Sequence, residues 1–339
     1  MAYRSKSPPR AVAEMTGLAE TYRIGRVHSV DNIMDTRYIR SVFPELARRG
    51  APLDLFYEVK ANLQYEQLKL MREGGVRAVQ PGIESFSNSI LDLMRKGCTG
   101  LQNVQLLRWC AELGIDISWN LLYGFPDEPP AEYERMAEFV PLLVHLPPPL
   151  FAFRFRMDRF SPLHTRAQEM GLGGVRPMEA YSYVYPLAAD ALRNLAYFFE
   201  FDYQDGRRPG EYARPLIERV EEWISVAATD PPRLDAYGTA DLLVIEDTRP
   251  CSVRSRQILT GLAARAYREC DVATKPAALA RRLEADPAEL QLVLDRFLEE
   301  KLMLEMDGQM LSLAVFRNRE ATPTRPQKKL FPLLAPVSA

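Results

Sequence analysis

The sequence predicts an α/β fold: a partial (β/α) barrel lacking its first strand, followed by a helical extension and a winged-helix-like unit. In the first half of the chain, short apolar runs of strand length alternate with helix-patterned segments. This alternation implies right-handed crossovers and a parallel sheet. After Arg159 the alternation stops and long helical patterns follow. The length of 339 residues exceeds that of one ordinary domain, so more than one structural unit is expected.

The elements of the first half follow from hydrophobic periodicity. Ser7-Pro8-Pro9 is a typical helix start, so the chain is expected to open on a helix that runs from Arg10 to Tyr22. Five strands are too few for an eight-stranded barrel, and this helix has no strand before it, although a doubly wound sheet is the alternative. The predicted strands are 24–30, 53–59, 76–83, 115–123 and 150–155, and the predicted helices are 36–49, 64–73, 87–94, 101–113 and 131–143.

The second half has a different pattern. Helices are predicted at 179–197 and 211–226 around the connector 205–210, then short strands at 233–236 and 242–245 and helices at 255–270, 277–284 and 287–300. Asp307-Gly308 between two apolar segments is a β-hairpin signal, which with the helices predicts a winged-helix-like unit. We therefore divide the chain into a partial barrel at 1–165, a helical extension with short strands at 166–250, a winged-helix-like unit at 251–317 and a disordered, proline-rich tail at 318–339.

The composition favours small molecules or peptides as partners. The net charge is only -2, with 47% hydrophobic and 26% charged residues, whereas nucleic-acid-binding proteins are strongly basic. The winged-helix-like unit carries ten basic and ten acidic residues from Arg254 to Arg317, which disfavours DNA binding. It is expected either to pack on the barrel or to capture a peptide. No membrane segment or signal sequence is recognisable, so a cytoplasmic location is expected; the oligomeric state is left open.

The cysteines and histidines form no recognisable metal site. Their spacing fits no CxxC, CxxxCxxC or zinc motif, so no metal ligand is predicted. Cys98 follows a basic pair and could be a reactive thiol, but a structural cysteine is favoured. The histidines are expected to be packing or surface residues. The residues are Cys98, Cys110, Cys251, Cys270, His28, His145 and His164.

Polar residues stand at the carboxyl ends of all five predicted strands, the edge where parallel barrels gather their reactive groups. Each residue alone could cap a helix or form a turn. Together they indicate a site, because buried parallel strands prefer apolar sequence. Carboxylates and amides can hold an ammonium group and hydroxyls, a basic side chain can pair with a carboxylate, and glycine allows close approach to an adenine. The candidates are Asp31, Asn32, Lys60, Asn62, Gln80, Glu84, Ser85, Asn120, Gly124 and Arg154.

Several segments resemble a known family. These are SVDNIMD, FYEVKANL, QPGIESFS, LMRKGCTGLQNVQLLRWC, WNLLYGFPDE and RFSPLH. Their order and spacing resemble radical S-adenosylmethionine (SAM) proteins that mature RiPPs, which are ribosomally made, post-translationally modified peptides. The members in question are similar to cobalamin-dependent C-methyltransferases. The resemblance implies a radical SAM barrel that acts on a precursor peptide, with SAM, a [4Fe-4S] cluster and cobalamin as cofactors.

The same resemblance assigns roles to the candidate residues, while no catalytic residue is assigned. It implies a SAM site at the strand ends and a peptide in the same cavity. The implied SAM contacts are Asp31 and Asn32 at the methionine end, Glu84 and Ser85 near the ribose or carboxylate, and Asn120 and Gly124 along the adenine; Lys60, Asn62, Gln80 and Arg154 would contact SAM or the peptide.

The sequence also departs from the family pattern. The family has a CxxxCxxC cluster loop immediately before the segment that matches MAYRSKSP, and a cobalamin-binding domain before that; neither is present in this sequence, so the chain is expected to be inactive alone. Asp127 replaces the usual glycine, and Pro129 follows Glu128. A misassigned start codon or a frameshift is the favoured explanation. The alternatives are a non-catalytic, peptide-binding or protein-binding remnant, or assembly with a separate chain that carries the cluster loop. Translating the DNA upstream of Met1 discriminates among them.

Overall fold

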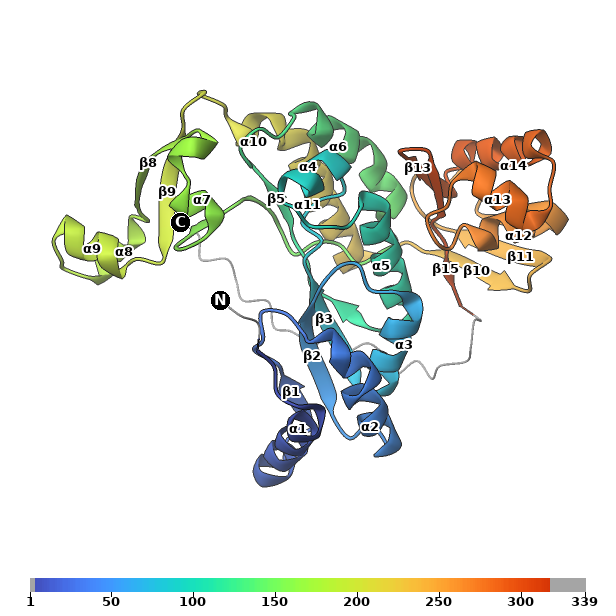
Figure 1. Cartoon of the computed structure of the whole chain (residues 1–339). Coiled ribbons are helices and arrows are strands. Elements are labelled where there is room, and N and C mark those ends of the chain that lie inside the picture. Colours follow the sequence, from blue (N-terminus) through green and yellow to red (C-terminus); the bar gives the residue numbers. More distant parts are fainter. Residues whose placement is uncertain (1–3, 318–339) are drawn as a thin grey trace.

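A parallel sheet forms the centre of the computed structural model, which describes residues 4–317 (Figure 1). Four strands pair in parallel in sequence order, and two further strands form a parallel pair. A parallel bridge between Glu84 and Leu121 links the two sets. The predicted parallel sheet is confirmed, and the partial barrel stays a prediction. The strands are β1 (Arg26–His28), β2 (Asp54–Val59), β3 (Val76–Pro81), β4 (Asp116–Ile117), β5 (Leu121–Tyr123) and β6 (Ala152–Arg154).

Helices cover one face of this sheet. In β2, Leu55, Tyr57 and Val59 are buried, whereas the residues between them are only half-buried. This alternation buries one face of the strand against helices and leaves the other more open. Every predicted helix of this half is present within a few residues. The helices are α1 (Pro8–Tyr22), η1 (Thr36–Arg40), α2 (Val42–Arg48), α3 (Tyr65–Glu73), α4 (Asn88–Leu93), α5 (Gly100–Leu113) and α6 (Ala131–Leu143).

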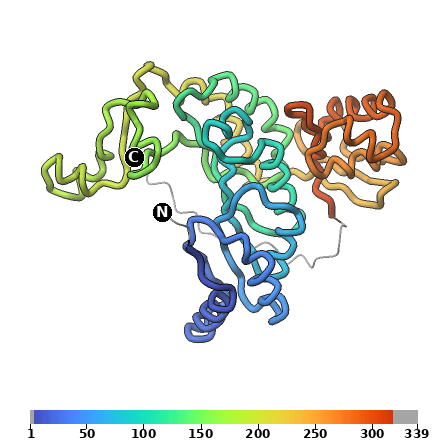
Figure 2. The backbone as a smooth tube through the Cα atoms, viewed as in Figure 1, coloured from blue at the N-terminus to red at the C-terminus, as the bar shows by residue number. Residues whose placement is uncertain are grey.

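A small antiparallel unit follows β6 and lies at one end of the molecule (Figure 2). The predicted helix at 179–197 is wrong as a single element, because Pro186, which has no N–H group, lies in the break between α8 and α9. The unit has its own small core, which includes Phe155, Phe199 and Phe201. Its elements are β7 (Met157–Asp158), α7 (Pro162–Thr165), η2 (Gln168–Met170), β8 (Leu172–Pro177), α8 (Ala180–Val184), α9 (Ala189–Leu195) and β9 (Phe198–Tyr203).

The chain then returns to the first unit and enters a C-terminal unit. Helix α11 packs against α6. The predicted boundary at 250/251 is wrong, because β10 and β11 belong to one sheet with β12 and β15, in the order β12-β11-β10-β15. The elements are α10 (Pro209–Tyr212), α11 (Arg214–Thr229), β10 (Leu234–Gly238), β11 (Leu242–Asp247), β12 (Arg256–Thr260), α12 (Gly261–Glu269), α13 (Pro276–Leu283), α14 (Pro287–Glu299), β13 (Met303–Met306), β14 (Gln309–Ser312) and β15 (Val315–Phe316).

Two further predictions for the C-terminal unit have clear outcomes. The helix predicted at 255–270 begins only at Gly261, because residues 256–260 alternate between exposed and buried positions and pair with β11. The Asp307-Gly308 hairpin is confirmed: both residues have positive φ, 52° and 70°, as a two-residue type I′ turn requires. The winged-helix-like architecture stays a prediction, and the predicted tail at 318–339 lies outside the described residues.

A buried arginine fixes the C-terminal unit to the first unit. The Arg108 side chain on α5 is fully buried, donates to the Ser312 carbonyl oxygen at 3.0 Å and pairs with the Asp271 carboxylate at 2.5 Å. His145, just after α6, makes a second contact through Nε2 to the Leu313 carbonyl oxygen at 2.9 Å. These contacts support the expectation that the unit packs on the sheet-and-helix core. Among the described residues, no helix combines the length and apolarity that crossing a bilayer demands.

Candidate functional site

The structure places most of the predicted site residues at one edge of the parallel strands, whereas Asn120 precedes β5 and lies level with the loop after β3. Because β1, β2, β3, β5 and β6 run in parallel, their carboxyl ends share this edge, which we call the rim. Most of the candidates are exposed; Glu84 and Asn120 are half-buried, and Ser85 and Gly124 are buried. The rim candidates in chain order are Asp31 and Asn32 after β1, Lys60 and Asn62 after β2, Gln80 in β3, Glu84 and Ser85 after it, Asn120 before β5, Gly124 after β5 and Arg154 at the end of β6.

The loop after β3 is held by hydrogen bonds from the Asn103 side chain on α5. The buried Asn103 amide donates to the carbonyl oxygens of Ile83, at 3.2 Å, and Ser85, at 2.8 Å. Glu84 has a left-handed φ of 60°, and its carboxylate pairs with Lys96 Nζ at 2.5 Å. The Ser85 hydroxyl is buried and accepts a hydrogen bond from the Ser87 amide at 3.1 Å. In this conformation the Glu84 carboxylate is paired with Lys96, and the Ser85 hydroxyl bonds within the loop.

Asn103 is not among the predicted site residues, although its position on α5 carries a signal. It lies on a helix whose residues are mostly buried, so a polar side chain there needs a partner inside the protein. The same helix buries Gln105, whose side-chain oxygen accepts from the Ala273 amide at 3.0 Å. A polar residue on an apolar helix face therefore indicates a side chain that forms hydrogen bonds with the backbone of a nearby loop or unit.

Asn120 has an unpaired buried atom at the rim. Within residues 4–317, its side-chain oxygen Oδ1 is buried and has no hydrogen-bond partner. Buried polar atoms in proteins are nearly always hydrogen-bonded, and an unmet acceptor costs about 1–3 kcal/mol. An N–H or O–H group of a ligand would satisfy this oxygen. Asn120 is therefore the predicted site residue that carries an unused buried acceptor.

Glu128 closes the loop that follows β5. The Glu128 side chain is 2% exposed, and it accepts hydrogen bonds from the amides of Gly124, at 2.7 Å, and Phe125, at 2.8 Å. It also accepts from the hydroxyls of Tyr133, at 2.7 Å, and Tyr212, at 2.6 Å. Four donors compensate the cost of burying this carboxylate.

The two sequence departures in this loop are compatible with its closure. Asp127 has a left-handed φ of 63°, which explains the advantage of glycine there; aspartate is among the residues that tolerate this conformation. Pro129 precedes α6, where the missing N–H group has no helical partner to lose. The loop therefore forms around Glu128 despite both substitutions.

One side of Gly124 is occupied by other side chains. Gly124 has a φ of 92°, and a Cβ atom added there would lie 2.6 Å from the Tyr203 hydroxyl and 2.8 Å from Arg154 Cγ. The Tyr203 hydroxyl donates to the Gly124 carbonyl oxygen at 2.5 Å. The Arg154 guanidinium lies over the Phe201 ring, 4.8 Å from its centroid. Tyr203 and Arg154 thus fill the space on the Cβ side of Gly124.

Part of the chain matches a known protein family. Residues 3–140 match the family model of the Radical SAM superfamily. This segment is a radical SAM domain. Over 140 residues the chain is 29% identical to the uncharacterized methyltransferase PH0819 of Pyrococcus horikoshii, a match that covers 40% of this chain and 30% of that protein. The radical SAM prediction is confirmed, and RiPP maturation stays a prediction.

Two solved structures show a weaker likeness. The radical SAM methyltransferase TsrM of Kitasatospora setae, solved with tryptophan and a SAM analogue, has a TM-score of 0.49 and 17% identity over 67% of this chain and 48% of its own. The cobalamin-dependent SAM radical enzyme OxsB, solved with aqua-cobalamin and SAM, has a TM-score of 0.37 and 17% identity over 42% of this chain and 23% of its own. The chain therefore spans less than half the length of each of these relatives.

The described residues do not fit the iron-sulfur cluster that the radical SAM fold implies. A [4Fe-4S] cluster needs three thiolates at one place. Cys98, Cys110 and Cys270 are buried and Cys251 is half-buried, and burial raises the pKa of all four thiols, to about 12 for Cys110 and Cys270. Across residues 4–317, no group of three or more His, Cys, Asp or Glu side chains could hold a metal ion. We therefore derive no chemical step through a cluster.

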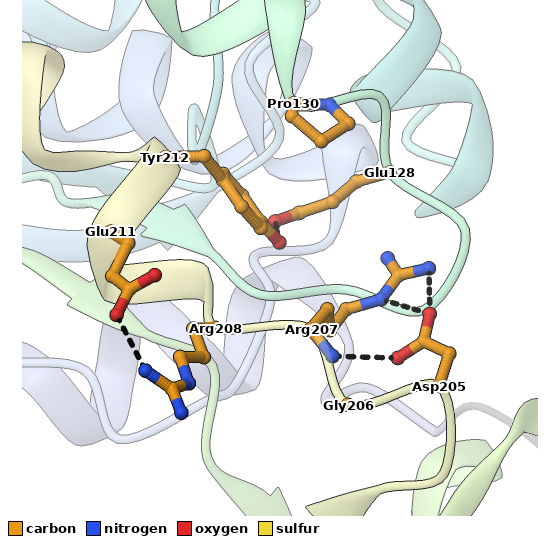
Figure 3. Close-up of a pocket in the computed structure, with 8 residues that line it drawn as sticks. All are labelled: Glu128, Pro130, Asp205, Gly206, Arg207, Arg208, Glu211 and Tyr212. Carbon is orange, nitrogen blue, oxygen red and sulfur yellow. Dashed lines mark hydrogen bonds and ion pairs between the residues drawn. The ribbon is translucent and has the colours of Figure 1, made fainter.

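A pocket of about 540 Å³, which was not predicted, lies beside the Glu128 loop (Figure 3). Arg207 and Arg208 extend along its wall, each in an ion pair: Arg207 with Asp205 at 2.6 Å and Arg208 with Glu211 at 3.1 Å. These pairs come from the connector between β9 and α11. The residues that line the pocket are Glu128, Pro130, Asp205, Gly206, Arg207, Arg208, Glu211 and Tyr212.

Proposed function

We propose that the rim binds S-adenosylmethionine, and that the chain is part of a radical SAM enzyme that matures ribosomally made precursor peptides. The enzyme would resemble B12-dependent C-methyltransferases. The observation that carries the SAM proposal is the unpaired, buried Asn120 Oδ1 at an edge where five parallel strands place polar side chains. When bound, SAM supplies a reactive sulfonium.

The rim offers the groups that SAM requires. The Glu84 carboxylate can accept from ribose hydroxyls or the ammonium group, and Lys60 can pair with the ligand's carboxylate. Asn120 Oδ1 can accept from an N–H group, such as the adenine amino group. Two backbone loops, fixed by Asn103 and Glu128, hold these groups in place. Preorganised groups of this kind cost little to order on binding.

Two parts of the proposal, cobalamin and the peptide, come from the family resemblance; two similar solved structures also contain cobalamin. TsrM and OxsB have both been solved with cobalamin, and we propose it as a cofactor of the complete enzyme.

The peptide proposal is tested by fluorescence anisotropy, using as the probe a labelled synthetic peptide from a short reading frame next to this gene. Saturable binding that an unlabelled copy competes away supports peptide maturation, and its absence counts against it.

Isothermal titration of SAM into the purified full chain tests the SAM proposal. We expect the wild type to bind saturably and Asn120→Ala to bind about tenfold more weakly, the usual effect of one lost hydrogen bond with a well-placed acceptor. Asn194→Ala, on the exposed face of α9, is the matched control and should bind as the wild type does. A wild type that does not bind SAM, or an equal loss in both variants, would remove the rim as the site.

A further inference from the structure

The segment between β9 and α11, residues 203–212, contacts the loop of residues 124–128 at three points. We call residues 203–212 the clamp segment. The Tyr203 hydroxyl donates to the Gly124 carbonyl oxygen at 2.5 Å, and Arg207 Nη1 donates to the Phe125 carbonyl oxygen at 3.3 Å. The Tyr212 hydroxyl donates to Glu128 Oε1 at 2.6 Å. Residues about eighty positions apart thus act on one five-residue loop.

These contacts act on the groups that define the loop conformation. Glu128 holds the Gly124 and Phe125 amides, so fixing the carboxylate fixes both peptide units. Tyr212 holds Glu128 Oε1, the same oxygen that accepts from the Gly124 amide. Removing the Tyr212 hydroxyl would leave a buried carboxylate with one donor fewer, which loosens its hold on the loop.

The clamp keeps the same protonation state across the neutral range. Burial raises the pKa of the Tyr203 phenol well above its usual value. Burial, together with the hydrogen bond to Glu128, does the same for the pKa of Tyr212. Both hydroxyls therefore stay protonated and remain donors. The clamp contacts consequently do not depend on pH near neutrality.

The clamp segment is only partly packed against the loop. The pocket of about 540 Å³ lies between them, with Glu128 and Pro130 contributed by the loop side and Asp205 to Glu211 by the clamp side (Figure 3). At the pocket wall, Arg207 donates to the Phe125 carbonyl oxygen and Tyr212 donates to Glu128. Hydroxyl groups therefore add to an apolar contact between the two segments, since Phe125 packs on the small core together with Tyr203 and on the main core together with Tyr212.

From this arrangement we infer that Tyr203 and Tyr212 are positioning residues for SAM, which hold the Gly124–Glu128 loop in its binding-competent shape. The inference rests on the proposed function, because Gly124 follows β5 at the rim. Neither tyrosine needs to touch SAM for this role. Loss of either hydroxyl lets the loop sample other conformations, and SAM affinity falls by the fraction of time that the loop spends in them.

The test combines hydrogen exchange with SAM titration on the full chain. The variants are Tyr203→Phe and Tyr212→Phe, which remove one oxygen each. Tyr183→Phe is the matched control, because the exposed Tyr183 hydroxyl also donates to a glutamate, Glu179, at 2.6 Å. We expect the Gly124 and Phe125 amides to exchange about tenfold faster in Tyr212→Phe, and SAM to bind about tenfold more weakly in both clamp variants. Amide exchange in α5 should not change.

The two measurements separate this inference from the proposed function. Faster loop exchange with unchanged SAM affinity would overturn the positioning role and leave the rim as the SAM site. Unchanged loop exchange in Tyr212→Phe would also overturn it, because the hydroxyl would then not hold the loop. A wild-type chain without SAM binding overturns both the proposed function and the inference. Weaker SAM binding in the control Tyr183→Phe would likewise refute a specific clamp.

Discussion

Gly124→Ala is expected to destabilise the protein more than alanine at a glycine whose Cβ position is open. The left-handed φ of 92° costs an alanine about 1–2 kcal/mol. The new Cβ would also lie 2.6 Å from the Tyr203 hydroxyl and 2.8 Å from Arg154 Cγ, so these side chains must shift, which typically costs about 1–3 kcal/mol. The two effects together lower the free energy of unfolding by about 2–5 kcal/mol.

Gly114→Ala is the control that isolates the steric part. Gly114 ends α5 with a φ of 64°, and its Cβ would meet no heavy atom within 4 Å. Urea unfolding followed by circular dichroism gives both free energies. We expect a loss of about 1–2 kcal/mol for Gly114→Ala, from the φ term alone. Tyr203→Phe should recover part of the extra loss in Gly124→Ala, because it removes the nearest atom. Equal losses at Gly124 and Gly114 would refute the close approach.

Three further predictions concern the buried polar groups. Asp271→Ala leaves the Arg108 charge buried without its carboxylate, and should lower the free energy of unfolding by about 3–5 kcal/mol, against at most about 1 kcal/mol for Glu222→Ala in an exposed ion pair. Burial holds the pKa of His145 well below its usual range; the unfolded chain therefore takes up a proton that the folded chain does not, and stability should fall as pH drops below about 6.5, by up to about 1.4 kcal/mol per pH unit. Urea unfolding measured across that pH range should show that the free energy of unfolding of His145→Gln depends less steeply on pH than that of the wild type. The Cys110 thiol, whose pKa burial raises to about 12, should react with Ellman's reagent only after denaturation, and rapid reaction of the native protein would contradict its burial.

The fold of the first half could be predicted because its pattern is local. Helix α6 has the predicted bounds, since its buried residues recur with helical period. The strand predicted at 115–123 is interrupted in the structure, where the buried Trp119 donates from Nε1 to the Pro147 carbonyl oxygen at 3.1 Å. The antiparallel sheet of β7, β8 and β9 was missed because its pairing joins Met157 to Phe199, far along the chain. No local period reports such pairings.

The candidate site was predictable to the same extent. The carboxyl ends of parallel strands lie at one edge of a sheet, so the rim residues could be predicted from the strand ends alone. The residues that support the rim loops could not be predicted in this way. Tyr203 and Tyr212 reach the loop from distant positions, and their role depends on how the antiparallel unit returns the chain to α11. Asn103 gave a signal only through its place on a buried helix.

The two rim loops are joined into one structure close to Asn120, whose side-chain oxygen has no partner among the described residues. The Leu122 amide donates to the Glu84 carbonyl oxygen at 2.9 Å, so the loop braced by Asn103 is tied directly to the strand that leads into the loop closed by Glu128. Asn120 lies immediately before that connection. On either side of it, the Trp119 carbonyl oxygen accepts from the Leu150 amide and the Leu121 amide donates to the Phe151 carbonyl oxygen. The Asn120 side-chain oxygen has no partner among the described residues. A fold that fixes both loops and keeps a buried acceptor between them bears a cost of about 1–3 kcal/mol, which a ligand that donates a hydrogen bond would recover.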